Sequence, residues 1–264
     1  MNMKNSFFGR WQLAVSTWLL AVGCLLPAQT ASAGHFLGDV SIDGRVGYSL
    51  GATAPLGIPA TIRKLNSYKP TASFLVGIDA RKPFADKWGL QVGLHFENKA
   101  MDAAITTKGY HMAMVKGGES LEGVYTGRVE QYVKEWMVTM PVTATLDLGQ
   151  DWRIEAGPYV SYLVSREFSG NVSNGYLRKD NPTGQKIEMG DAPEERATYD
   201  FSDQMRRWQA GVTVGARWLF SERFGLHANL SWGLTGVMKS SFKTVEQTLY
   251  PIYGTIAVSY LIKN

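Results

Sequence analysis

Glu97, Glu135 and His95 are the candidate residues for acid–base or nucleophilic catalysis in this sequence. The two glutamates lie near the outer ends of neighbouring predicted strands, so their carboxyl groups could come close together. Paired carboxyl groups can act as general acid and base, and a histidine beside a carboxylate can activate a hydroxyl nucleophile. Pairing of each acid with an arginine or lysine explains the same residues more simply, because buried charges persist when they are paired. We therefore expect no catalytic site and no enzymatic activity.

Metal and cofactor binding would need other patterns. The sequence contains no His-Glu-x-x-His motif, no paired cysteines and no carboxylate-rich metal loop. We expect no metal and no cofactor. His95 and His227 are expected to belong to a network of buried charges.

The strands that must position these residues are clearest between Arg207 and Thr235. Apolar side chains occupy the even positions from Trp208 to Trp218, and polar side chains or glycines occupy the odd positions. The alternation resumes after a short break at residues 221–223. A period of two predicts extended strands, and two strands with a tight break predict a hairpin. The apolar face carries aromatic ends and no charge, so we expect it to face lipid while the polar face lines a barrel.

The spacing of Trp208 and Trp218 supports a membrane location. They are ten residues apart on one face, which is roughly 33 Å along a strand and roughly 25 Å after a tilt of about 40°. This is the height of the apolar band of an outer-membrane barrel. Trp152 and Tyr162 repeat the spacing. Aromatic residues of an ordinary protein core would not need this ten-residue spacing on one face.

The same alternation predicts eight strands. They cover residues 40–51, 71–80, 88–97, 135–148, 152–165, 207–218, 226–235 and 252–262. Short turns are expected at 82–87, 149–151 and 221–223, and long connections at 55–70, 98–134, 166–205 and 237–249. We expect 98–134 to be a projecting hairpin that is polar on both faces, and 166–205 to be irregular. The fold class is an all-β, single eight-stranded antiparallel up-and-down transmembrane β-barrel with long extracellular loops.

Two sets of side chains follow from this arrangement. The aromatic residues expected to form the membrane girdles are Trp88, Trp136, Trp152, Tyr162, Trp208, Trp218, Trp232 and Tyr260. The charged residues expected to fill the lumen are Asp43, Arg45, Asp79, Arg81, Glu97, Glu135, Asp147, Arg153, Glu155, Arg207 and Arg217. Eight strands enclose a lumen so narrow that side chains fill it, so we expect a packed network of ion pairs rather than an ion pathway.

The N-terminus has the pattern of a secretory signal peptide. Lys4 and Arg10 precede a mostly apolar segment at 11–26, and a small-residue cleavage site ends at Ala33. The prediction is a signal peptide at 1–33, cleaved after Ala33, and one barrel domain at 34–264. Cys24 lies in the apolar segment and leaves lipidation open as an alternative. The formal net charge of +4 comes without clustered basic residues, so we expect no nucleic-acid partner.

Five segments resemble the PorT-like outer-membrane β-barrel family of Gram-negative bacteria, and the resemblance covers nearly all of 34–264. They are WGLQVGLHFENKAMDA (88–103), EWMVTMPV (135–142), GPYVSYLVSREFSG (157–170), YDFSDQMRRWQAGVTVGARW (199–218) and LYPIYGTIAVSYLI (249–262). The resemblance implies an outer-membrane location, assembly by the barrel-assembly machinery and, for some members, a role in protein secretion. One departure is the C-terminus, where Lys263 and Asn264 stand in place of the usual terminal aromatic residue.

The leading hypothesis is a non-enzymatic outer-membrane protein whose extracellular loops bind a ligand or stabilise the envelope. Its expected partners are outer-membrane lipid, the assembly machinery during biogenesis, and envelope or secretion proteins. The alternative is a subunit of a secretion or assembly complex. An outer-membrane enzyme and a small pore are weaker alternatives. A soluble lipocalin-like barrel would need its apolar residues inside.

Overall fold

The computed structural model describes residues 39–263 except 58, 72, 243 and 245–247. The predicted signal peptide at 1–33, its cleavage site and Cys24 lie outside the described residues. The β-barrel belongs to the compact unit Val40–Asn264. No helix in the described part of the chain is long and apolar enough to cross a membrane.

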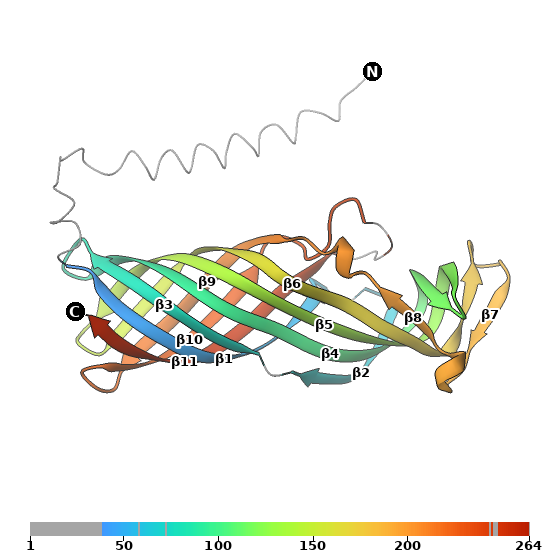
Figure 1. The fold of residues 1–264 in the computed structure, drawn as a ribbon, viewed down its shortest axis with the longest axis horizontal. Coiled ribbons are helices and arrows are strands. Elements are labelled where there is room, and N and C mark those ends of the chain that lie inside the picture. Colours follow the sequence, from blue (N-terminus) through green and yellow to red (C-terminus); the bar gives the residue numbers. More distant parts are fainter. Residues whose placement is uncertain (1–38, 58, 72, 243, 245–247, 264) are drawn as a thin grey trace, which may run out of the picture. The chain divides into compact units, whose positions relative to one another are not determined.

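Of the eleven strands in the described residues, eight close into a ring in which all neighbours are antiparallel. In spatial order they are β1 (Ser41–Pro55), β3 (Phe74–Pro83), β4 (Trp88–Lys116), β5 (Glu119–Leu148), β6 (Trp152–Lys179), β9 (Trp208–Leu219), β10 (Phe224–Gly233) and β11 (Leu249–Lys263) (Figure 1). The ring closes because β11 pairs with β1. Closure gives every strand two neighbours, which a sheet in lipid needs because lipid offers no hydrogen-bond partner. The predicted eight-stranded barrel is confirmed.

Short turns gather at one end of the ring. β3 joins β4, β5 joins β6 and β9 joins β10 through connections of a few residues each, as the sequence predicts. The start of β1 lies at the same end as the end of β11, since Ile42 is opposite Lys263. The first and the last strand of the barrel therefore begin and end, respectively, on the side of the short turns.

The two faces of the ring differ in polarity. The outward-facing side chain of Leu94 is 61% exposed, whereas the neighbouring inward-facing His95 is 5% exposed. The same alternation of exposed apolar and buried polar side chains continues around the ring, as at Val46 and Arg45. A soluble lipocalin-like barrel would bury the apolar set instead, so the pattern is that of a lipid-facing barrel.

Three strands are much longer than a membrane crossing requires. β4, β5 and β6 contain 29, 30 and 28 residues, whereas a tilted transmembrane strand needs about 9–11. They run on beyond the ring (Figure 1), and β4 and β5 stay paired from Trp88 to Lys116. We call the part of the sheet beyond Asn98 the outer extension. The predicted projecting hairpin at 98–134 is confirmed, and it is formed by the continuation of β4 and β5 themselves.

The outer extension has an apolar interior, so the expectation that 98–134 is polar on both faces was wrong. Met101, Met112, Tyr125 and Val133 are buried in one cluster there. The alternation is masked in the sequence because the β4–β5 register shifts between Thr107 and Tyr110. A bulge adds one residue to a strand and moves the following side chains to the opposite face. The inward set therefore changes from odd to even positions along β4.

Two of the other three long connections, 55–70 and 166–205, also contain strands. β2 (Ile62–Pro70) pairs with β4 inside the segment expected to be a loop at 55–70. Within 166–205, β6 continues to Lys179, β7 (Lys186–Met189) pairs with β6, and β8 (Ala197–Asp200) bridges β6 and β4. Two short 3-10 helices, η1 (Pro193–Glu195) and η2 (Ser202–Gln204), flank β8. The expectation of an irregular 166–205 was therefore wrong.

Candidate functional site

The predicted girdle residues lie in two groups at the two ends of the ring. At the turn end, Trp152 stacks on Trp218 with ring centroids 6.1 Å apart, and Tyr260 packs against Phe224 at 5.2 Å. Trp88 begins β4 at the same end. At the other end, Tyr162 packs against Trp208 at 5.0 Å. Trp136, which packs against Phe74 and Phe96, and Trp232 near the end of β10 complete this outer group.

At the turn end of the lumen two ion-pair groups join distant strands. Arg217 makes a two-pronged contact with Asp43, with nitrogen–oxygen distances of 2.8 and 3.2 Å. Asp147 accepts hydrogen bonds from Arg81 at 2.7 Å and from Arg153 at 2.6 Å. Bidentate and shared arginine contacts of this kind hold both partners in a fixed geometry. They close the lumen at this end.

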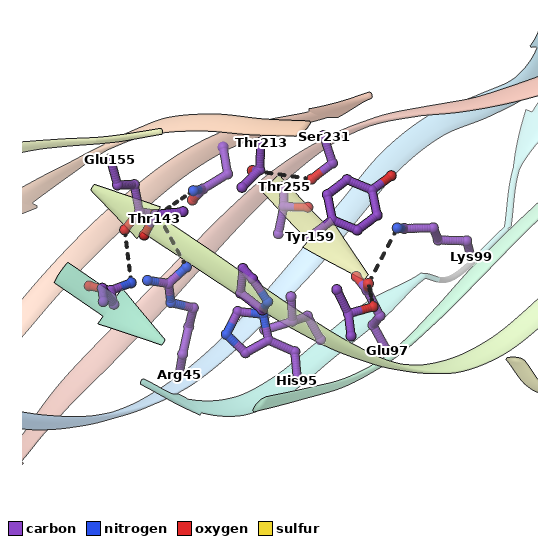
Figure 2. A pocket seen from close by; sticks show the side chains of 15 residues that line it. Arg45, His95, Glu97, Lys99, Thr143, Glu155, Tyr159, Thr213, Ser231 and Thr255 are labelled. Carbon is purple, nitrogen blue, oxygen red and sulfur yellow. Dashed lines mark hydrogen bonds and ion pairs between the residues drawn. The ribbon is translucent and has the colours of Figure 1, made fainter. Parts of the chain in front are cut away.

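Glu155 is the centre of the middle layer. Its carboxylate contacts Arg45 at 3.4 Å, accepts a hydrogen bond from Gln91 at 3.0 Å and accepts another from Asn229. The ring nitrogen Nδ1 of His227 lies 4.0 Å away. Figure 2 shows Arg45 and Glu155 facing each other across the lumen. One acid on β6 therefore connects side chains from three other strands, β1, β4 and β10.

Arg45 also reaches a second acid of the middle layer. Its Nε lies 2.9 Å from Asp79, and the other oxygen of Asp79 lies 2.9 Å from Nε2 of His95. The expectation that His95 and His227 belong to the charge network agrees with this geometry. Among the described residues, no group of three His, Cys, Asp or Glu side chains is placed to hold a metal ion.

The outer layer of the lumen contains the two glutamates considered for catalysis. Glu97 pairs with Lys99 at 3.3 Å and accepts a hydrogen bond from Thr139, whereas Glu135 accepts one from Gln209 at 2.7 Å. Lys99 is directly opposite Glu135 in the β4–β5 register, so it stands between the two acids. Figure 2 shows Lys99 pointing toward Glu97. Each carboxylate is thus held by a partner of its own.

The space left in the lumen is small. The cavity in Figure 2 has a volume of about 40 Å³ and lies between the middle and outer layers, beside His95, Glu97 and Tyr159. A water molecule needs roughly 10–15 Å³ of such space. The cavity therefore has room for a few water molecules but is too small for a sugar or peptide substrate.

One predicted lumen residue was wrong. Arg207 is exposed, and its guanidinium donates a hydrogen bond to the hydroxyl of Tyr162 at 3.2 Å in the outer girdle. It precedes β9, where the enclosing wall ends, so its side chain is free to turn outward. The sequence analysis also missed Lys99, because it follows the predicted end of its strand. Its odd number continues the inward set of β4 and could have indicated the position.

The interior of the outer extension is held by apolar packing and buried tyrosines. Tyr125 donates a hydrogen bond to the carbonyl of Ser173 at 2.7 Å, and Tyr199 donates one to the carbonyl of Glu130 at 2.9 Å. Burial raises the pKa of both phenols above the ordinary value. They therefore remain protonated donors across the physiological range. The extension is a second packed region, separate from the charged lumen.

Comparison with known proteins gives a family match and several similar structures. Residues 28–239 match the sequence profile of the outer membrane protein beta-barrel domain family. No curated protein matches the sequence. Similar solved structures are the attachment invasion locus protein Ail of Yersinia pestis (12% identity, TM-score 0.37, covering 84% of this chain and 97% of that chain) and Neisserial surface protein A (9%, 0.34, 84% and 97%). An outer membrane channel from Pseudomonas putida F1 is also similar (11%, 0.28, 84% and 95%). At these identities and TM-scores the matches carry no argument about function.

Proposed function

The chain belongs to the outer membrane protein beta-barrel domain family, and from this premise we propose that it is a non-enzymatic integral protein of the Gram-negative outer membrane. In this proposal the ring anchors the protein in the membrane, and the outer extension carries out its function. The extension presents a rigid β-sheet surface outside the membrane. It binds a partner there or stabilises the envelope.

The observation that carries the proposal is the contrast in what fills the two regions. Charged side chains are paired across the lumen, and the cavity between its middle and outer layers measures about 40 Å³, which supports an anchor rather than a channel. The extension keeps three paired strands and an apolar core of its own. From Phe96 to Lys116, β4 extends for roughly 60 Å along the strand at about 3.3 Å per residue. Strands of that length are far longer than membrane anchoring requires, which supports a function outside the membrane.

A second candidate function is membership of a secretion or assembly complex, which the narrower PorT-like resemblance implies. The observation in its favour is a pair of edge strands. Across the described residues β2 pairs only with β4, and β7 pairs only with β6. An edge strand presents unpaired backbone groups that a strand of another protein can join.

The test is a shortened barrel. Replacing 103–131 and 170–199 with four-residue Gly-Ser turns cuts the sheet at one level, because Asp102 is paired with Tyr132, Tyr132 with Ser169, and Ser169 with Asp200. The lumen network stays intact. Heat-modifiable migration on a gel checks that the shortened barrel folds and inserts.

The proposal expects the shortened barrel to insert normally and to leave cells more permeable to vancomycin, or to lose envelope components that co-purify with the full chain in mild detergent. Co-purifying secretion proteins in stoichiometric amounts would favour the second candidate. An inserted, shortened barrel that matches the full chain in both measurements would overturn the proposal. Hydrolysis of lipopolysaccharide or peptide by the purified full chain would overturn its non-enzymatic part.

A further inference from the structure

The wall of the barrel has a seam between β1 and β2. The β1–β3 ladder ends where Tyr48 is opposite Phe74. Beyond this point β1 continues to Pro55 along β11, and β2 takes the place of β3 beside β4. No ladder joins β1 to β2 across the described residues of the two strands. A hydrogen bond from the hydroxyl of Tyr68 to the carbonyl of Gly51 bridges the gap.

An apolar pocket lies behind this seam. Its volume is about 230 Å³, and its lining includes Ala54 of β1, Leu65 of β2, and Ile105 and Met112 of β4. Leu65 remains 59% exposed although it faces this space, so the pocket is open rather than packed. An apolar cavity of about 150 Å³ already binds benzene in place of water. This pocket is therefore large enough for a segment of hydrocarbon chain.

The seam opens at the height of the membrane surface. Phe74, where β3 begins, packs against Trp136 of the outer girdle at 5.3 Å, and β2 ends just beyond this level, where Pro70 is opposite Met101. Aromatic girdles mark the boundary between the apolar band and the head groups. A molecule in the outer leaflet can therefore reach the pocket sideways, without crossing the charged lumen.

β2 adds positive charge beside the apolar pocket. Leu65 and Tyr68 are opposite Ile105 and Ala103 and share the inner face, whereas Lys64 and Lys69 are opposite Thr106 and Asp102 on the outer face. Arg63 and the two lysines are exposed. The described residues place no carboxylate within 4.0 Å of these three side chains. Asp102 offsets one of the charges through its cross-strand position, and the strand keeps a basic excess.

We propose that this pocket binds the hydrocarbon chain of an anionic amphiphile that enters through the β1–β2 seam. The chain lies against Leu65, Ile105 and Met112, and the anionic group lies outside, in the positive electrostatic field that Arg63, Lys64 and Lys69 create along β2. A free fatty acid and an acyl chain of lipopolysaccharide share this chemistry. The inference goes beyond the proposed function, because it requires no partner at the distal surface of the extension.

The test is photo-crosslinking in phosphatidylcholine nanodiscs, with dodecanoate carrying a terminal diazirine as the probe. Ile105→Trp fills the pocket, and Thr106→Trp places the same side chain on the opposite face of β4. Leu65→Trp is a second filling variant at an exposed position, where folding makes little demand. Heat-modifiable migration and a shared distal epitope confirm that each variant is folded.

Crosslinks are expected on β2 and on 101–112, with a loss of at least fivefold in Ile105→Trp and Leu65→Trp and no loss in Thr106→Trp. Tyr68→Phe removes the bridge across the seam and is expected to increase the rate of labelling. Lys64→Glu combined with Lys69→Glu is expected to weaken labelling by dodecanoate severalfold and to leave labelling by the matching diazirine-bearing dodecanol unchanged.

Lipid A added to the nanodiscs distinguishes the two sources. Competition by lipid A assigns the site to bilayer lipid, whereas unchanged labelling assigns it to free fatty acid. Labelling spread over lipid-facing residues such as Val214 and Leu230, with equal yields in all variants, would overturn the inference. This result would leave the proposed function of the distal surface untouched, because the shortened-barrel experiment measures that separately.

Discussion

The membrane ring and the outer extension share the three long strands β4, β5 and β6, yet their interiors are opposite in chemistry. Inside the ring, Glu155 and Arg45 meet among other buried polar groups while Leu94 faces outward. Inside the extension, Met112 and Val133 are buried. The difference follows from what surrounds each region. A strand in lipid places its apolar side chains outside, whereas a strand in water gains free energy by burying them.

The comparison also separates the sources of stability. In the ring, paired charges hold the strands from within, and losing one partner leaves a buried charge without compensation. In the extension, burial of apolar side chains holds the strands together, and each side chain stabilises a smaller part of the protein than a lumen ion pair does. Substitutions in the two regions should therefore differ in how much they lower the free energy of unfolding and in how much of the protein they destabilise.

The largest effect is expected from Arg45→Ala. It leaves the buried carboxylates of Asp79 and Glu155 without their shared cation, which should lower the free energy of unfolding by about 3–5 kcal/mol. Urea titration of the barrel in lipid vesicles measures this change. Arg207→Ala is the matched control, because Arg207 is exposed at the girdle, and it should change the value by less than about 0.5 kcal/mol. Equal effects of the two variants would show that the lumen network is not the source of stability.

A charge on the outside of the wall should come next. Val214 faces lipid about midway between the two girdles, and Val214→Arg should cost about 2–4 kcal/mol. Val115 is similarly exposed near the tip of the extension, so Val115→Arg should be nearly neutral in the same vesicle titration. A large penalty at Val115 would mean that the extension is not in water and would break the comparison.

A smaller and local effect is expected inside the extension. Tyr199→Phe removes the hydrogen bond to the carbonyl of Glu130, at a cost of about 1 kcal/mol. Limited proteolysis should show faster cleavage of β8 and of the distal part of β6. Heat-modifiable migration of the barrel should stay the same. Loss of barrel folding would show that the two regions are coupled.

The smallest expected effect concerns one girdle pair. A double-mutant cycle of Trp152→Ala and Trp218→Ala should give a coupling energy of about 0.5–1.5 kcal/mol, because the two rings stack at 6.1 Å. Unfolding in vesicles provides the four free energies. A coupling of zero would mean that the girdle residues act on lipid independently.

The sequence predicts the ring well because one rule applies throughout it. Strict alternation with lipid outside marks each crossing, and short turns mark one end. The rule also predicts that Asp43 and Arg217 point inward. It does not predict that they form a pair, because they are separated by 174 positions and the pairing depends on the stagger between strands.

In the extension, the rule of strict alternation with apolar side chains facing outward no longer applies. Beyond Thr107 a register shift in the β4–β5 ladder moves the inward set to the even positions, and water replaces lipid outside. Met112 and Met114 then become core residues, although the barrel rule would place them on the lipid face. Lys99 was missed for a related reason, since it lies just past the last residue with the lipid-facing pattern.

The proposed function requires that the lumen is sealed and that the binding surface lies outside the ring. The measurement to make first is the current of the purified chain in a planar lipid bilayer. We expect no steady conductance for the native chain, and conductance when Arg45 and Arg217 are both replaced by alanine, because this change removes ion pairs from two layers of the network. A steady conductance of the native chain would show instead that the lumen is open and that the barrel is a pore.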